Sequence, residues 1–213
     1  MRSERRAVAI DLRGHGESDA PAAPQGYAVE AVATDIEAVV DALELEPFVL
    51  VGHSMGGSSA AAYVKRHSDR VAGLLLVGTP GKADPAMAEQ ILTSLEADYD
   101  NGMLQYTSGL LENATPPIAA RIRSEMQRVP KERSLAIIGA VFAYDPLPAL
   151  RAYQRPILIV DTAHGDGPTA LHNQLPEVQR EVITGTSHWP HLDKPEAFSA
   201  ILDRLIADAE AAQ

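Results

Sequence analysis

The feature that most constrains the fold of this chain is a serine set between glycines directly after a short apolar run. Residues 48–51 read FVLV, residues 52–56 read GHSMG, and small residues follow at 57–62. The pattern predicts a strand, a sharp turn with Ser54 at its apex, and then a helix. Glycines flank the serine because such a bend brings backbone segments together and leaves no room for side chains.

This local arrangement predicts that Ser54 is a nucleophile. A helix that starts after Ser54 directs backbone N–H groups and the positive end of its dipole toward negative charge forming there. The N–H of Met55, the residue after the serine, is the expected oxyanion donor. A serine nucleophile also needs a base that takes its proton and a carboxylate that orients the base.

Length and composition limit the classes of protein that fit. A chain of 213 residues is long enough for one domain with an insertion. A net charge of −11 argues against nucleic-acid binding, which requires a basic surface. The absence of cysteine excludes disulfides, thiolate metal sites and a cysteine nucleophile.

Neither a membrane span nor a signal peptide is expected. No apolar run approaches the length of a membrane span, and only four apolar residues follow the charged segment 1–6. We therefore expect a cytoplasmic protein without membrane or nucleic-acid partners. Nothing in the sequence implies a metal or an organic cofactor.

Short apolar runs alternate with helical patterns along much of the chain. The runs predict buried strands at residues 7–10, 48–51, 74–77, 157–160 and 180–183. Amphipathic helices are predicted between most of them and near the C-terminus, at residues 198–206. This alternation is typical of an α/β fold with a mostly parallel sheet flanked by helices.

Residues 80–152 interrupt the alternation. They contain no predicted strand, and helical patterns occur at residues 86–99, 103–112, 117–128 and 132–142. We expect a helical cap, or lid, inserted into a core formed by residues 1–79 and 153–213. Its larger apolar residues fit either the interior of the cap or a pocket for a small apolar acyl substrate: Met87, Leu95, Tyr99, Met103, Tyr106 and Phe142.

His188 is the predicted base. It follows the last predicted strand, and ligands of open α/β sheets bind at the carboxyl ends of the strands. His191, three residues further on, is the alternative. His53 is adjacent to Ser54 but faces away at such a bend, so we expect a structural or substrate-side role for it.

The triad acid is predicted among aspartates that lie between Ser54 and His188 in the sequence. Asp166 lies in a glycine-flanked loop after the strand at 157–160 and is the first choice. Asp161, which closes that strand, is the alternative, and Asp84 is a third candidate. Each gives the chain order serine, acid, histidine.

Three segments together resemble one known family. They are residues 11–19 (DLRGHGESD), residues 51–57 (VGHSMGG), and residues 185–188 (GTSH) with 193–198 (DKPEAF). They are similar to the α/β-hydrolase superfamily, in particular to serine hydrolases and esterases with a cap domain. The resemblance implies a Ser54 nucleophile, a His188 base and hydrolysis of an ester or another small acyl compound. Relatives with the same triad run cofactor-free perhydrolysis or C–C bond hydrolysis, and some relatives only bind ligands.

The sequence departs from this family in two places. The family's acid usually lies four residues after the last apolar residue of the strand, where this chain has His164, so Asp166 requires a two-residue insertion. Three strands normally precede the one expected at 7–10, and a His-Gly loop after the third supplies the second oxyanion donor. We therefore expect a fragment or a misassigned start, with impaired catalysis. The run at 7–10 should either pair with 48–51 or leave two rows of backbone groups unpaired.

Overall fold

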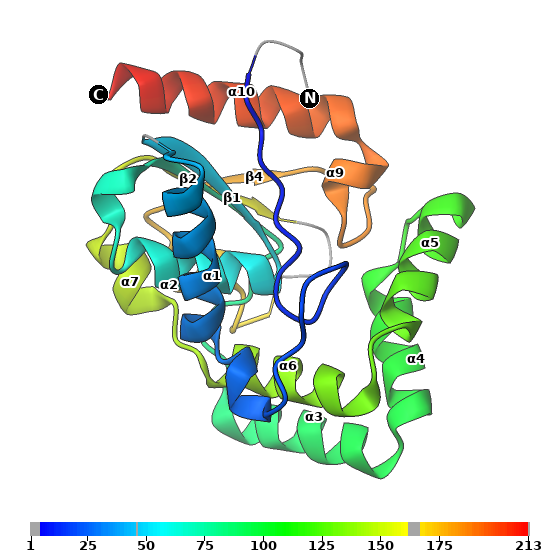
Figure 1. The fold of residues 1–213 in the computed structure, drawn as a ribbon. Coiled ribbons are helices and arrows are strands. Elements are labelled where there is room, and N and C mark those ends of the chain that lie inside the picture. The colour runs from blue at the N-terminus through cyan, green and yellow to red at the C-terminus, as the bar shows by residue number, and fades with distance from the viewer. Residues whose placement is uncertain (1–4, 46, 162–166, 213) are drawn as a thin grey trace.

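The computed structural model describes residues 5–45, 47–161 and 167–212 as an α/β fold (Figure 1). The sheet of the described chain has the order β1-β2-β3-β4, and each neighbouring pair is parallel. Its strands are β1 (Phe48–His53), β2 (Val71–Val77), β3 (Ile157–Asp161) and β4 (Gln179–Val182). The predicted fold class is confirmed, and four of the five expected strands are present.

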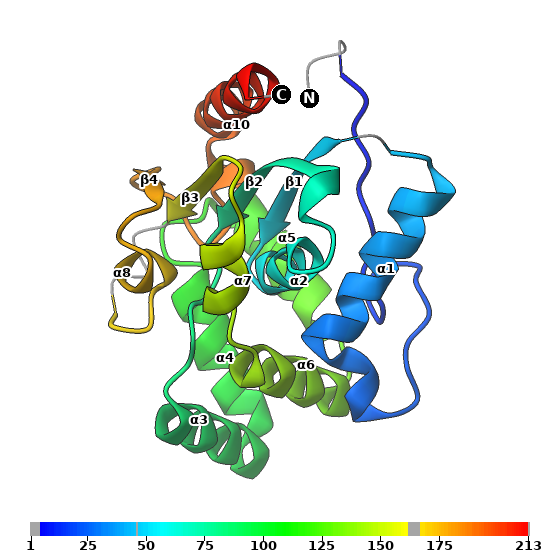
Figure 2. The ribbon, with the colours of Figure 1, turned by 90° about the vertical axis from the view of Figure 1, so that its left-hand side faces the viewer.

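Helices cover both faces of this sheet (Figure 2). One face carries α1 (Val29–Ala42), α2 (Met55–Val64) and α7 (Leu147–Ala152), and the other carries α10 (Pro195–Ala211). Four short helical turns complete the connections: η1 (Pro24–Tyr27), η2 (Ser68–Arg70), α8 (Leu171–Gln174) and α9 (Pro190–Asp193).

The central strand β2 divides the core into two layers. Leu74 and Leu76 pack in one apolar cluster with α1, α2 and α7, whereas Leu75 and Val77 pack in a second cluster with α10. Successive side chains of a strand point to opposite faces of the sheet. Because helices cover both faces, every residue of β2 is buried. The carboxyl end of β2 is therefore held from both sides.

The segment 80–152 is helical, as the sequence predicts. It contains α3 (Pro85–Ala97), α4 (Tyr99–Leu110), α5 (Pro116–Gln127), α6 (Lys131–Ala143) and then α7. Helices α3 and α6 lie on the side of the molecule away from α10 in Figures 1 and 2, and α4 and α5 stand to one side of the core in Figure 1. Their assignment to a separate cap domain stays a prediction.

The strand predicted at residues 7–10 is wrong. Residues 5–12 form an extended segment without strand assignment, drawn in dark blue in Figure 1. Within the described residues, β1 bonds to β2 on one side and to no other strand. Of the two expected outcomes, the described residues show the second, because residues 5–12 do not pair with β1 as a strand.

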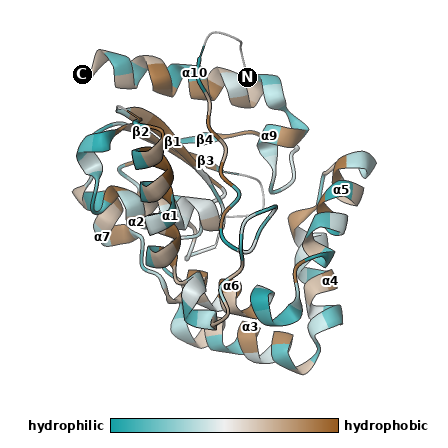
Figure 3. Ribbon diagram, viewed as in Figure 1, coloured by the Kyte–Doolittle hydropathy of each residue, from teal (hydrophilic) through white to brown (hydrophobic). Residues whose placement is uncertain are grey.

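A large cleft lies along this open edge of the sheet. Its volume is about 2010 Å³, and its walls include residues 5–10, β1 and the turn at Ser54. Both β1 and β2 are mostly apolar (Figure 3). Val8 and Val51 are each 42% exposed, on the extended segment and on β1 respectively. The edge strand thus faces an apolar cleft that continues to the serine turn.

No helix in the described parts of the chain is both long and apolar enough to cross a membrane.

The open edge predicts a contrast between two alanine substitutions. Val51→Ala should lower the free energy of unfolding by about 1 kcal/mol or less, because the side chain is partly solvated. Leu76→Ala should cost about 2–5 kcal/mol, since Leu76 is fully buried in the core. Urea-induced unfolding of both variants measures the difference. Equal losses would mean that residues 5–12 cover the β1 edge.

Candidate active site

Ser54 occupies the turn between β1 and α2 with a strained backbone. Its φ is 52° and its ψ is −120°, a conformation that residues other than glycine rarely adopt. The Ser54 N–H donates to the Val77 carbonyl at 2.8 Å, and the Ser54 carbonyl accepts from the Gly57 N–H at 2.9 Å. The turn is therefore bonded both to β2 and to the first turn of α2.

Two of the neighbouring glycines are required by close packing. A Cβ atom on Gly52 would lie 2.5 Å from the Cα of Gly57, and one on Gly57 would lie 1.9 Å from Oγ1 of Thr79. A Cβ atom on Gly56 would meet nothing within 4 Å. The end of β1 and the start of α2 thus pass so closely that only Gly52 and Gly57 are sterically necessary.

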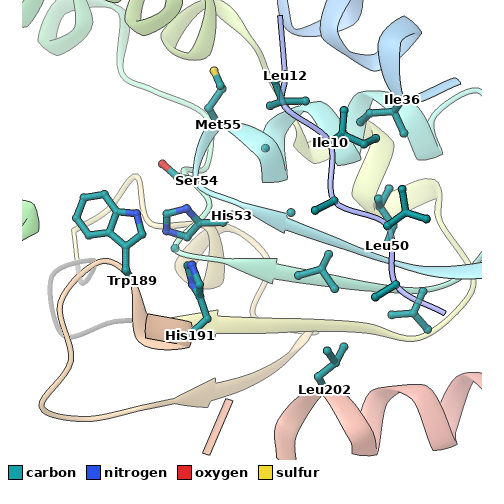
Figure 4. Close-up of a pocket in the computed structure, with 18 of the residues that line it drawn as sticks. Ile10, Leu12, Ile36, Leu50, His53, Ser54, Met55, Trp189, His191 and Leu202 are labelled. Atoms are coloured by element: carbon teal, nitrogen blue, oxygen red, sulfur yellow. The ribbon is translucent and has the colours of Figure 1, made fainter. Parts of the chain in front are cut away.

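The start of α2 faces the cleft at the same point. Ser54 and Met55 both line the cleft, and Figure 4 shows the Ser54 hydroxyl on the side of Trp189. The N–H groups in the first turn of an α-helix have no acceptor within the helix. The N–H of Met55, the first residue of α2, is therefore suited to bind negative charge that forms beside Ser54.

His188 lies at the same end of the sheet as Ser54. Its ring packs on Gly78, where a Cβ atom would lie 2.8 Å from Cε1 and 3.0 Å from Nδ1 of His188. Gly78 directly follows Val77, whose carbonyl binds the Ser54 N–H. Ser54 and His188 also line one cleft. The fold thus brings the predicted nucleophile and the predicted base together.

The backbone of His188 is held from two sides. Its N–H donates to the carbonyl of Leu110, at the end of α4, at 2.9 Å. Its carbonyl is 2.7 Å from Nε2 of His53. One residue earlier, the N–H and hydroxyl of Ser187 donate to Oδ2 of Asp193 at 2.7 and 2.6 Å. The loop that carries His188 is therefore tied to β1, to α4 and to α9.

His53 is enclosed by aromatic rings. Its ring centroid lies 4.8 Å from that of His188, 5.9 Å from Trp189 and 5.1 Å from His191. Burial, reinforced by the nearby His188, lowers the pKa of His53 to about 3. The ring is consequently neutral at physiological pH. The sequence predicted either a structural role for His53 or a role on the substrate side. The hydrogen bond of His53 to the His188 carbonyl joins two residues that are 135 positions apart in the chain.

Two of the candidate acids have other partners. Asp161 is 5% exposed, and its Oδ2 lies 2.5 Å from Nδ1 of His172 and 2.8 Å from Nε of Arg180. Asp84 caps α3 by accepting from the Met87 N–H at 2.9 Å. Neither aspartate belongs to the described lining of the cleft. The first choice, Asp166, lies outside the described residues, as does His164.

The alternative base, His191, also lines the cleft. Its ring lies 5.7 Å from that of Phe198, centroid to centroid, and burial lowers the pKa of His191. His15 lines the cleft too. His188 packs on Gly78, next to Val77, whose carbonyl binds the Ser54 N–H. This position favours His188 over His191 and His15 as the candidate base.

The helical segment supplies an apolar wall of the cleft. Met103, Tyr106 and Phe142 line it, together with Ile137 and Val141 of α6. Of the other three residues predicted for either the cap interior or a pocket, Leu95 is buried, Met87 is exposed, and Tyr99 is not part of the described lining. Within the described residues, no cluster of three or more His, Cys, Asp or Glu side chains could hold a metal ion.

Comparison with known proteins identifies the family. The family model described as alpha/beta hydrolase fold matches residues 2–195, so the chain belongs to the α/β-hydrolase fold family. The expected superfamily is thus confirmed. Most of the named relatives of this chain are hydrolases.

Two curated relatives match almost the whole chain. A putative 2-succinyl-6-hydroxy-2,4-cyclohexadiene-1-carboxylate synthase of Bacillus subtilis (strain 168) is 27% identical over 97% of this chain and 82% of its own. A 3-oxoadipate enol-lactonase 2 of Acinetobacter baylyi is 23% identical over 93% of this chain and 78% of its own. Among solved structures, Est816, titled an N-acyl homoserine lactone degrading enzyme, has a TM-score of 0.76. It is 28% identical and covers 91% of this chain and 80% of its own.

The packing at the turn predicts different outcomes for two neighbouring glycines. Gly57→Ala should destabilise the fold by about 1–3 kcal/mol, because its methyl group would overlap Thr79. Gly56→Ala should be neutral or slightly stabilising, since the site is open and alanine favours a helix by up to about 1 kcal/mol. Thermal unfolding of both variants tests this prediction, and equal destabilisation would contradict the described packing.

Proposed function

We propose that this chain is a serine hydrolase that cleaves an ester or another small acyl compound through an acyl-serine intermediate. The observation that carries the proposal is the convergence at one cleft of the strained Ser54 turn, the α2 N-terminus and the His188 ring. A nucleophile, a base and an oxyanion donor at one point are what acyl transfer requires.

In the first half-reaction, the Ser54 oxygen bonds to the acyl carbon while its proton passes to His188. The carbonyl electron pair moves onto oxygen, and the Met55 N–H stabilises that oxyanion. When the intermediate collapses, the bond to the leaving alcohol breaks and His188 returns the proton to the alcohol oxygen. Water then attacks the acyl-serine by the same steps and releases the acid and free Ser54.

Asp166 is the proposed acid that orients the His188 imidazolium. The contacts of Asp161 support this choice, because its carboxylate already lies against His172 and Arg180. A carboxylate fixed between two basic side chains in the interior would have to leave both in order to reach His188.

The proposed substrates are small and apolar. The cleft next to Ser54 is walled by apolar side chains of α4 and α6, which would form part of the proposed cap over residues 80–152. The enol-lactonase relative and Est816, whose title names lactone degradation, support a cyclic ester as one form of the substrate. A lactone follows the same chemistry, with the leaving alcohol joined to the acyl group.

Met55 is the proposed oxyanion donor, and an N–H group in that role typically contributes about 3–4 kcal/mol of transition-state stabilisation. C–C bond hydrolysis and perhydrolysis need the same nucleophile and base, so they remain alternatives. Assays with a C–C substrate and with peroxide and halide, run beside ester hydrolysis, distinguish these reactions.

A fluorophosphonate probe tests the proposed nucleophile directly. The wild-type chain should label covalently, whereas Ser54→Ala should not label and His188→Ala should label at least about 10²-fold more slowly. Hydrolysis of short p-nitrophenyl esters should fall in parallel. A folded wild-type chain that does not label would indicate a ligand-binding protein instead of a hydrolase.

Asparagine variants of Asp166 and Asp161 should show which of the two aspartates is the triad acid. Asp166→Asn should lower kcat by about 10²–10⁴-fold with little change in melting temperature, because it removes the orienting carboxylate. Asp161→Asn should instead lower the melting temperature, because it removes the buried carboxylate that lies against Nδ1 of His172 and Nε of Arg180. The reverse pattern, measured by ester hydrolysis and calorimetry, would assign Asp161 as the acid.

A further inference from the structure

We propose that His53 is a positioning residue that fixes the base His188 relative to the nucleophile Ser54. It acts through a hydrogen bond from its Nε2–H to the His188 backbone carbonyl. The inference rests on the proposed serine hydrolase function, and it assigns to that function a residue outside the proposed triad.

The contact defines the protonation of the His53 ring. A backbone carbonyl oxygen only accepts hydrogen bonds, so Nε2, 2.7 Å away, must carry the proton. A pKa of about 3 keeps the ring neutral, and a neutral imidazole carries one N–H. His53 therefore exists as the Nε2–H tautomer, with an unprotonated Nδ1.

The position of His53 in the chain gives this bond its significance. His53 is the last residue of β1 and is joined to Ser54 by a peptide bond. The path from nucleophile to base thus runs through one peptide unit, one imidazole ring and one hydrogen bond. Residues 53 and 188 are otherwise separated by 135 positions of chain. This link fixes the base loop directly to the strand that carries the serine.

Surrounding rings limit the freedom of His53. In Figure 4 the ring lies beside Trp189 and above His191, next to Ser54. Centroid distances of 5.9 and 5.1 Å to those rings correspond to direct packing. The His188 N–H is meanwhile held by the Leu110 carbonyl. With both its N–H and its carbonyl bonded, the backbone of His188 is oriented before substrate arrives, which is the condition for efficient proton transfer.

Two substitutions separate the hydrogen bond from the packing. His53→Gln keeps an N–H donor at a similar reach, whereas His53→Met fills similar space without a donor. His53→Met should lower both kcat and the fluorophosphonate labelling rate of Ser54 by about tenfold, with KM changed less than about twofold. His53→Gln should restore both rates to within about threefold of wild type. Melting temperatures of the two variants serve as the folding control.

The outcomes distinguish this proposal from the function on which it rests. Equal labelling of His53→Met and wild type would overturn the positioning role and leave the hydrolase intact. Equal slowing in both variants would also overturn it, because packing alone would then explain the loss. A folded wild-type chain that fails to label overturns the hydrolase itself.

Nitrogen-15 NMR of the histidine rings tests the hydrogen bond without reference to activity. His53 should remain a neutral Nε2–H tautomer from about pH 5 to pH 8. An Nδ1–H tautomer, in which Nε2 carries no proton, would overturn the proposed bond.

Discussion

The positive φ of Ser54 is the constraint on which the rest of the site depends. Such a conformation costs about 1–3 kcal/mol for a non-glycine residue and persists only where its surroundings enforce it. Here the Ser54 N–H is bonded to Val77, and Gly52 and Gly57 let β1, α2 and the Thr79 side chain meet without overlap. The strained turn thus rests against β2, a strand in which every residue is buried and closely packed.

The helical segment also contributes to the site's geometry. Its Leu110 carbonyl binds the His188 N–H, and Nη1 of Arg133 donates to the Gly14 carbonyl at 2.7 Å. At the base of the segment, Nζ of Lys82 lies 3.1 Å from Oδ2 of Asp145 and joins its two connections to the sheet. The helices that wall the cleft are therefore bonded to the loop that carries the proposed base, His188.

Sequence patterns were informative where the determining contacts are local. The serine turn followed from residues 52–57 alone, and the apolar stripe of α1 places Ile36 and Val40 in the core. Residues 7–10 have the same apolar character as β1 but form no strand, because strand formation depends on a neighbour that no local pattern encodes. The bonds from His53 and Leu110 to the His188 backbone were likewise unpredictable, since each joins distant parts of the chain.

The open edge of β1 and the turn at Ser54 line one cleft. Its volume of about 2010 Å³ exceeds the roughly 300–1,000 Å³ of an ordinary small-molecule pocket because the space beside β1 joins it. In the proposed mechanism, Ser54, Met55 and His188 must keep their relative positions while the acyl group is transferred. The backbone supplies this order, because Ser54 is bonded to the Val77 carbonyl and His188 is bonded to Leu110 and His53.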